Sequence, residues 1–182
     1  MTAVPEGRWS RSRYALWLYA LMVRLEQLKA EEGPRLRAIR LRALLDAPDA
    51  FGCTFEETVA RPAESWSKQL LDLPTFVAVR DGLDVGVVRC ARDDARIETA
   101  WLISMWVAPE VRRGGVGGAL VDAIIKWARS SGVNRLLLDV ADNNAPAIAL
   151  YTRKGFAPTG VVSTLPLPRE HIREHQRELR LS

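Results

Sequence analysis

The sequence predicts an α/β fold in which about seven strands form one mixed sheet with flanking helices. Segments of helical period alternate with short runs rich in β-branched residues. Residues 135–140, RLLLDV, form a nearly continuous apolar run, which is typical of a central strand covered on both faces. The length of 182 residues suits one domain with a short appendage.

The first half of the chain predicts one strand and two helices. Residues 23–26 alternate apolar and charged side chains, as a half-buried strand does. A helix is expected from Pro34 to just before Pro48, with Arg40 and other arginines mostly away from its buried face. That face carries Leu36, Ile39, Ala43 and Leu44. Residues 48–61 are expected to form a loop, and Pro62 to open a second helix.

Three strands are predicted next, over residues 75–80, 85–92 and 96–107. Asp81 and Gly82 have the composition of a hairpin turn between the first two.

The remaining chain predicts a helix, a strand, a second helix and two terminal strands. The first helix has an amphipathic pattern whose buried stripe is expected to be Val116, Leu120, Ala123, Ile124, Trp127 and Ala128. The expected ranges are 115–130, 135–140, 145–154, 156–162 and 176–181.

Charge and cysteine content exclude several classes of protein. The net charge of +4 comes mostly from residues 1–24, where four arginines face one glutamate, so the body has no basic nucleic-acid footprint. The apolar run 14–23 is too short to span a bilayer. Cys53 and Cys90 are far apart and form no metal or redox motif, which favours a reducing, cytoplasmic location. We expect an N-terminal extension over 1–21, helical or disordered, and one domain over 22–182.

The clearest chemical signal is residues 107–120, VAPEVRRGGVGGAL, where a predicted strand turns through glycines into a helix. Glycines let backbone N–H groups approach a phosphate, and the start of a helix favours negative charge. Arg112 and Arg113 add positive charge at the rim. The pattern predicts an anion-binding turn; tight packing of the turn alone is the alternative.

Two other phosphate-binding patterns fit less well. The segment starting at Gly115 lacks the third glycine of a dinucleotide fingerprint, although Asp139 follows at a suitable distance. A nucleotide-binding loop would need a Gly-Lys-Ser/Thr sequence, which this turn does not contain. A dinucleotide-binding oxidoreductase therefore stays a minor alternative.

Two motifs together resemble the GCN5-related N-acetyltransferase (GNAT) superfamily over residues 22–182. Arg112, Gly115 and Gly117 fill its Arg/Gln-x-x-Gly-x-Gly/Ala signature. A downstream motif, NxxAIxLYxxxGF, runs over residues 144–156. Arg113 stands where glycine is common in the family and Gly114 where a basic residue is common, which leaves the cradle intact.

The resemblance implies a binding site for acetyl-CoA as cosubstrate, without a metal. Pantetheine would lie like an extra strand beside Met105, Trp106 and Val107, and a backbone N–H near Val107 would polarise the thioester carbonyl. The backbone amides of 113–118 would hold the pyrophosphate. The implied cofactor contacts are Met105, Trp106, Val107, Arg112, Arg113, Gly114, Gly115, Val116, Gly117, Gly118, Asn144, Ala147 and Tyr151.

The resemblance also implies direct attack by a primary amine within a ternary complex. Tyr151 is the expected general acid for the CoA thiolate, with a plain core aromatic as the alternative. Asn144 would cap its helix and contact the cofactor. No cysteine nucleophile is required.

The general base stays open at this point. Glu98 lies too far along its strand from Val107. Asp139 is closer in the predicted topology. Phe51, Glu56 and Glu57 resemble the substrate-side loop of the family, although two solvated loop carboxylates are an equally simple interpretation.

A zinc-protease pattern, HxxEH, occurs at residues 171–175. Only seven residues follow it, and the sequence has no further histidine to complete such a site. We therefore expect a polar connection near the C-terminus and no metal.

The expected activity is transfer of acetyl from acetyl-CoA to a primary amine of a small molecule or a peptide, with neither nucleic acid nor membrane as partner. Members of the resembled family often dimerise, so a homodimer is compatible with the pattern. Besides the dinucleotide-binding oxidoreductase, two rival classes of protein stay open. One is a non-catalytic acyl-CoA-binding module, and the other is an interaction protein that uses the apolar segment 14–23.

Overall fold

The computed structural model describes residues 23–181, which contain one seven-stranded sheet of order β1-β2-β3-β4-β5-β7-β6. All neighbouring strands are antiparallel except β4 and β5, which are parallel. This confirms the mixed sheet that the sequence predicts. The strands are β1 (Arg24–Gln27), β2 (Thr75–Arg80), β3 (Leu83–Arg92), β4 (Thr99–Val107), β5 (Arg135–Ala141), β6 (Ala157–Thr164) and β7 (Arg173–Arg180).

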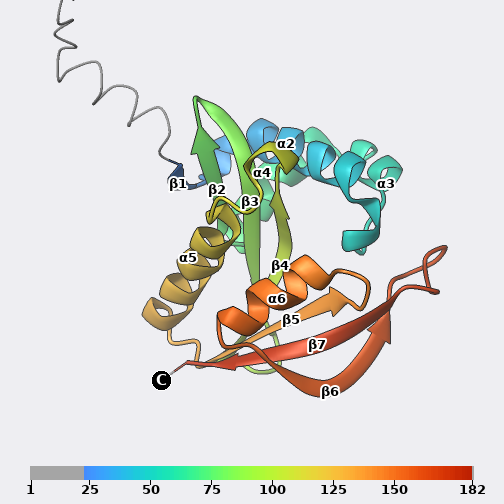
Figure 1. Ribbon diagram of the computed structural model, residues 1–182. Coiled ribbons are helices and arrows are strands. Elements are labelled where there is room, and N and C mark those ends of the chain that lie inside the picture. The colour runs from blue at the N-terminus through green and yellow to red at the C-terminus, as the bar shows by residue number, and fades with distance from the viewer. Residues whose placement is uncertain (1–22, 182) are drawn as a thin grey trace, which may run out of the picture.

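Helices cover both faces of the sheet (Figure 1). The helix α2 packs with α4 and contacts β3 on one face, whereas α5 contacts β2, β3 and β4 on the other. The helices are α2 (Gly33–Asp46), α3 (Phe55–Val59), α4 (Ala63–Asp72), α5 (Val116–Ser130) and α6 (Ala145–Arg153). Short 3₁₀ turns lie at η1 (Ala30–Glu32), η2 (Pro48–Ala50) and η3 (Pro109–Val111).

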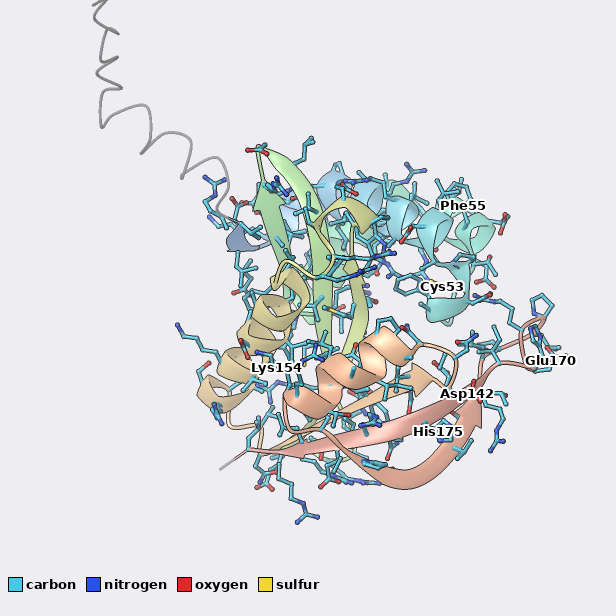
Figure 2. The ribbon with its side chains drawn as sticks, viewed as in Figure 1. Cys53, Phe55, Asp142, Lys154, Glu170 and His175 are labelled. Atoms are coloured by element: carbon cyan, nitrogen blue, oxygen red, sulfur yellow. The ribbon has the colours of Figure 1, made fainter. Side chains whose placement is uncertain are left out.

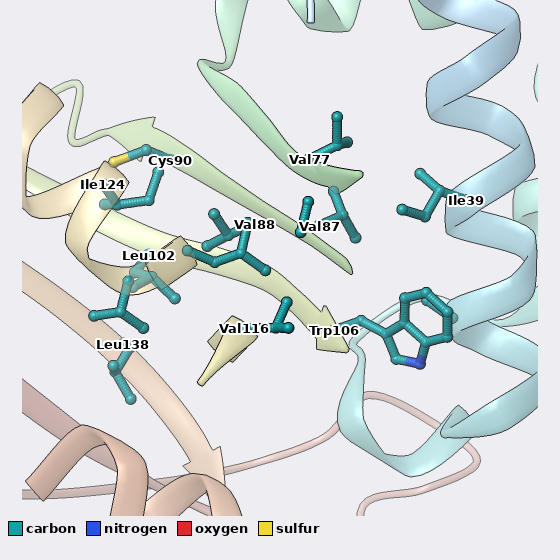
Figure 3. Packing of buried hydrophobic residues seen from close by; sticks show 14 of the residues in the cluster. Ile39, Val77, Val87, Val88, Cys90, Leu102, Trp106, Val116, Ile124 and Leu138 are labelled. Atoms are coloured by element: carbon teal, nitrogen blue, oxygen red, sulfur yellow. The ribbon is translucent and has the colours of Figure 1, made fainter. Parts of the chain in front are cut away.

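The core lies on both sides of the central strands, and β3 shows the alternation directly. Val87 lies on the side of Ile39 from α2, while Val88 lies toward Ile124 from α5 (Figure 3). Successive side chains of a strand point to opposite faces, so a strand covered on both faces must be apolar at nearly every position. β3 is accordingly buried from Val85 to Cys90.

β4 and β5 pair only where they begin. Their register joins Thr99 to Arg135, Ala100 to Leu136 and Trp101 to Leu137, and no later pair follows. Beyond this point the two strands run in different directions (Figure 1). Among the described residues, the edge of β4 from Leu102 onward therefore has no strand partner on that side.

A bulge in β4 lies where the strands separate. The pairing with β3 shifts between Val87 and Arg89, and Ser104 adopts a left-handed φ of 56°. The extra residue resets the alternation of side chains. Leu102 lies toward α5 in Figure 3, and Met105 also faces that helix. Trp106 therefore faces α2, where its indole N–H donates to Asp46 at 2.8 Å.

Four details differ from the sequence predictions. The expected loop 48–61 contains α3, because Thr54 and Glu57 form a reciprocal capping box at its start. The last strand begins at Arg173 rather than at 176. On α5, Val121 is buried, whereas Ala123 and Trp127 are only partly buried. Arg40 is not on an outer face: it is 5% exposed, in the middle of the buried face of α2.

Within residues 23–181, no helix has the length and apolar character needed to cross a membrane. The expected extension over 1–21, and the apolar segment 14–23 apart from its last residue, lie outside the described residues.

Candidate active site

A cavity of about 540 Å³ occupies the gap between β4 and β5. One wall is the unpaired edge of β4, and another is the first two turns of α6 with its Asn144 cap. The C-terminal end of α2 and the loop after it form a third wall, and the ends of β5 and β7 form the fourth. A gap of this kind can accept an extended ligand that uses the free backbone groups of β4.

The structure brings several of the predicted cofactor contacts into this cavity. Its lining includes Met105, Trp106, Val107, Arg112, Asn144, Ala147 and Tyr151. These residues come from three separate segments of the chain. Their convergence follows from the separation of β4 and β5.

The glycine turn, which we define as residues 113–118, lies outside the cavity at the exposed start of α5. Arg113 has a φ of 63° and Gly115 a φ of 85°, so two nearby left-handed residues shape the turn. Residues 112–115 are exposed, which leaves the turn open to a ligand from solvent.

Gly117 keeps the first turn of α5 close to the cavity walls. A Cβ at this position would lie 3.2 Å from Leu150 Cδ2 and 3.4 Å from Met105 Cε. A side chain here would therefore fill the space between β4, α5 and α6. The short glycine turn and this close approach together fit a phosphate-bearing, extended cofactor such as acetyl-CoA.

Arg112 is not a free charge at the rim of the turn. Its Nε donates to the carbonyl of Val107 at 2.9 Å, and its Nη2 pairs with Asp46. Asp46 also accepts the indole N–H of Trp106. Arg112 thus connects the end of β4 to the end of α2, and positions the turn rather than presenting a charge to the ligand.

Tyr151 lies on α6 and is 5% exposed, with its ring in edge contact with Phe156 at 5.8 Å between centroids. Burial raises the pKa of its phenol, so the hydroxyl keeps its proton at neutral and moderately alkaline pH. Among residues 23–181, no hydrogen bond to this hydroxyl is found. The phenol is therefore protonated at the cavity wall, although the raised pKa makes it a weaker acid than an ordinary tyrosine.

Asn144 caps the same helix. Its Oδ1 accepts from the backbone N–H of Ala147 at 3.3 Å, as expected for a helix cap. The cap directs the start of α6 toward the cavity, where both residues line the wall.

Asp139 and Glu174 form a pair of carboxylates at the β5–β7 wall. Asp139 is opposite Gln176 in the register and Glu174 is opposite Ala141, so the two side chains are diagonal neighbours on one face. The adjacent Leu138 and Val140 belong to the main core, which places Asp139 on the opposite face of β5.

Both carboxylates hold protons more tightly than usual. Asp139 is exposed at the mouth of the cavity, and partial desolvation there raises the pKa of its carboxyl. Burial, and then the charge of Asp139, raise the pKa of Glu174, which Arg169 partly offsets. Carboxylates with raised pKa values are better proton acceptors than ordinary surface carboxylates.

The predicted substrate loop contributes only one of its three candidates. Phe51 is buried and lines the cavity. Glu56 and Glu57 are not among the lining residues, and the Glu57 carboxylate accepts the backbone N–H of Thr54 in the capping box. Figure 2 shows the position of Cys53, which precedes α3, and of Phe55 at its start.

The histidines of the HxxEH pattern have separate positions, because His171 precedes β7 and His175 lies within it. Between residues 23 and 181, no group of three or more His, Cys, Asp or Glu side chains could hold a metal ion. Figure 2 shows His175 on β7.

Sequence reasoning missed Glu174, Arg40 and Asp46. Glu174 lies within the zinc-like pattern, and no local signal places it beside Asp139, because their proximity depends on the register between β5 and β7. Arg40 was assigned to an outer face, yet its spacing from Leu36 and Ala43 already matches the buried stripe. Asp46 carries no local signal, because its partners lie 60 and 66 residues away.

Comparison with known proteins agrees with this geometry. Residues 41–156 match the family model of the acetyltransferase (GNAT) family, and this segment includes the gap, the glycine turn and α6. The chain belongs to the acetyltransferase (GNAT) family.

Curated relatives include a mycothiol acetyltransferase of Beutenbergia cavernae, 29% identical over 77% of this chain and 46% of that protein. A streptothricin acetyltransferase of Streptomyces lavendulae is 36% identical over 52% of this chain and 50% of that protein. The chain spans half or less of the length of these relatives.

Among solved structures, a GNAT-family acetyltransferase from Streptococcus pneumoniae superposes with a TM-score of 0.78. The alignment covers 88% of this chain and all of that one, at 20% identity. The fold is therefore the one that the sequence resemblance implies.

Proposed function

We propose that this chain is an N-acetyltransferase that moves an acetyl group from acetyl-CoA to a primary amine of a small molecule. The observation that carries the proposal is the cavity at the separation of β4 and β5, with a proton donor and proton acceptors on different walls. Relatives named for mycothiol and streptothricin support a small-molecule acceptor.

The arrangement of the chain supports a particular set of cofactor contacts. The backbone amides from Arg113 to Gly118 would hold the pyrophosphate, with Arg112 fixing the turn. The free edge of β4 at Met105, Trp106 and Val107 would hydrogen-bond pantetheine. Ala147 and Asn144 would contact its other side.

Acetyl-CoA supplies the acyl group as a thioester when bound. The acceptor nitrogen attacks the carbonyl carbon, so a C–N bond forms and the C–S bond breaks. The acceptor ammonium loses two protons in the process. Asp139, assisted by Glu174, accepts the first and releases it to solvent after the reaction, and the second passes to solvent directly.

Tyr151 donates its proton to the departing thiolate and later regains one from solvent. The proton donor Tyr151 lies on α6, in the same core cluster as Leu138 and Val140 of β5. The proton acceptor Asp139 lies on the other face of β5. The acceptor amine would therefore enter from the side of Phe51 and Asp139, and the cofactor from the side of α5 and α6.

Calorimetric titration of acetyl-CoA tests the cofactor half of the proposal. We expect binding by the intact chain and at least tenfold weaker binding by Gly117→Val, whose side chain would crowd Leu150 and Met105. Ala123→Val adds bulk about two turns further along α5 and should leave binding unchanged. Equal affinity for all three proteins would contradict the proposed cofactor site.

Turnover with a library of amines, read as release of free CoA thiol, tests the chemical half. Tyr151→Phe should lower kcat by about 10²–10⁴-fold while acetyl-CoA affinity stays the same. Binding without turnover of any amine would instead indicate a non-catalytic acyl-CoA-binding module.

A further inference from the structure

Arg40 occupies a position where α2 would ordinarily carry an apolar residue. It lies between Leu36 and Ala43 on the buried face of the helix and is 5% exposed. It also forms part of the cavity wall, next to Phe51 and Cys53. A charge at such a position is costly unless it has a partner.

The partners of Arg40 within residues 23–181 do not neutralise it. Its guanidinium lies 4.7 Å from the centroid of the Phe51 ring, and Nη2 donates to Cys53 Sγ at 3.3 Å. Nη1 is buried without a hydrogen-bond partner. No carboxylate of the described residues lies within ion-pair distance of this guanidinium.

A second buried arginine adds to the uncompensated charge. Arg89 on β3 faces the same side of the sheet, donates from Nη2 to Gln69 at 3.1 Å, and leaves Nε without a partner. Burial, followed by the charges of Arg40 and Arg61, lowers the pKa of Arg89 to about 10. Burial likewise lowers the pKa of Arg40.

Two other arginines of the described chain, both only partly buried, have their charge balanced by carboxylates. Arg35 contacts three carboxylates, those of Glu26, Glu32 and Asp84. Arg135 pairs with Glu178. Arg40 and Arg89 are more deeply buried than these two arginines, yet they have no carboxylate partner among the described residues.

We propose that the acceptor amine also carries a carboxylate, and that Arg40 binds this carboxylate with Arg89 behind it. The inference rests on the proposed function for the identity of the amine as acceptor. A ligand carboxylate would supply the missing counter-charge and a partner for Nη1 through a charge-assisted hydrogen bond.

The position of Arg40 separates this site from the cofactor phosphates. Arg40 is on the face of the sheet that α2 covers, whereas the glycine turn opens α5, which covers the other face. Asp139 and Glu174 share the cavity with Arg40 and lie on its β5–β7 wall. The β5–β7 wall of the cavity thus suits an ammonium group, and the wall at Arg40 suits an anion. An amino acid, which carries both groups, has this pattern of charge.

The first test compares amino acids with their own carboxamides as acceptors. For the intact chain we expect kcat/KM to favour the free carboxylates by about 10²-fold. Arg40→Gln should abolish this preference, Arg40→Lys should retain part of it, and Arg37→Gln, one turn earlier on α2, should leave it unchanged. Carboxamides that react as well as the acids would overturn the proposal.

The second test needs no turnover, so it separates this inference from the proposed activity. Urea unfolding is followed in sodium acetate, in sodium phosphate and in sodium chloride at matched ionic strength. Acetate should raise the unfolding midpoint of the intact chain and not that of Arg40→Gln. Stabilisation by phosphate and not by acetate would overturn the carboxylate proposal: if it is lost in Arg40→Gln the anion at Arg40 is a phosphate, and if it persists there the phosphate binds at the glycine turn. Stabilisation by neither anion would overturn the anion site.

Arg40→Met supplies the matching stability measurement. If Arg40 serves a ligand, removal of an uncompensated buried charge should leave the unfolding midpoint in chloride unchanged or higher. A clearly lower midpoint would show that Arg40 serves the fold, and would count against the proposal. Failure of the acetyltransferase proposal would instead appear as absence of acetyl-CoA binding or turnover.

Discussion

At the scale of single residues, the carboxylates of Asp139 and Glu174 have an unusual environment. Both line the cavity. Burial raises the pKa of the half-buried Glu174, and partial desolvation raises the pKa of the more exposed Asp139. Arg169 is a charged group that faces Glu174 from outside the pair. It also donates to the carbonyl of Gly52, and so connects the segment before β7 to the loop that follows α2 at the cavity wall.

The pair predicts how activity depends on pH. An amine-accepting base must be deprotonated, so kcat/KM should fall as pH drops through the raised pKa values of the pair, above the ordinary carboxyl range near 4. Asp139→Asn should lower kcat by roughly 10²-fold or more and remove this limb of the profile. A limb that persists in the double variant with Glu174→Gln would assign it to another group.

The raised pKa of Glu174 also predicts that ionisation of this carboxyl lowers the stability of the fold. Because the folded state raises the pKa of Glu174, ionisation of this group disfavours folding at pH values above its folded pKa. Glu174→Gln should therefore unfold at higher urea than the native chain at pH 7. At a pH below the ordinary carboxyl pKa both groups are neutral, and the difference should vanish. An equal difference at both pH values would contradict the assignment.

At the scale of elements, the bulge in β4 decides which side chains face which wall. Ser104 adopts a left-handed φ of 56°, which costs a non-glycine residue about 1–2 kcal/mol. Ser104→Gly should be as stable as the native chain or more so, and Ser104→Val should be less stable by about 1–2 kcal/mol, measured by urea unfolding. Equal stability of both variants would show that the bulge is not strained.

The link between α2 and β4 is a second property at this scale. Asp46 accepts hydrogen bonds from Trp106 and Arg112, and its loss would leave both donors without this partner. Asp46→Ala should lower the unfolding free energy by about 1–3 kcal/mol and weaken acetyl-CoA binding, because the glycine turn loses its support. Asp72→Ala, an exposed acid on α4, should change neither quantity. Unchanged binding in Asp46→Ala would exclude this positioning role.

At the scale of the whole molecule, the gap that forms the cavity also separates two parts of the sheet. Only three register pairs join β4 to β5, whereas β3 and β4 share six. The core is nonetheless continuous, because residues of α5, α6 and β5 belong to one cluster with those of β2 and β3.

A ligand in the gap should therefore stabilise the whole chain. At a concentration of acetyl-CoA near 100 times Kd, the expected gain is about 2.7 kcal/mol, which corresponds to roughly 5–10 °C in Tm. The shift should appear as one transition in differential scanning calorimetry, and Gly117→Val should show a much smaller one. Two transitions, of which acetyl-CoA moves only one, would mean that the two parts unfold independently.

The order and type of nearly all elements could be predicted from the sequence, since they depend on local periodicity. The stripe of α5, the apolar run of β5 and the turn at Asp81 and Gly82 each lie within one window of the chain. The glycine turn and the cap at Asn144 are equally local, because glycine conformation and helix capping depend on neighbouring residues.

The sequence by itself thus determined the family, the mixed sheet and the position of the glycine turn. Only the tertiary structure decided that Arg40 is a buried wall of the cavity, that Asp46 anchors Arg112, and that Glu174 stands beside Asp139. These relations join residues that are far apart in the chain, through strand register and through the extra residue at Ser104. Periodicity in one segment carries no information about such partners, because long-range register is set only when the strands and helices pack together.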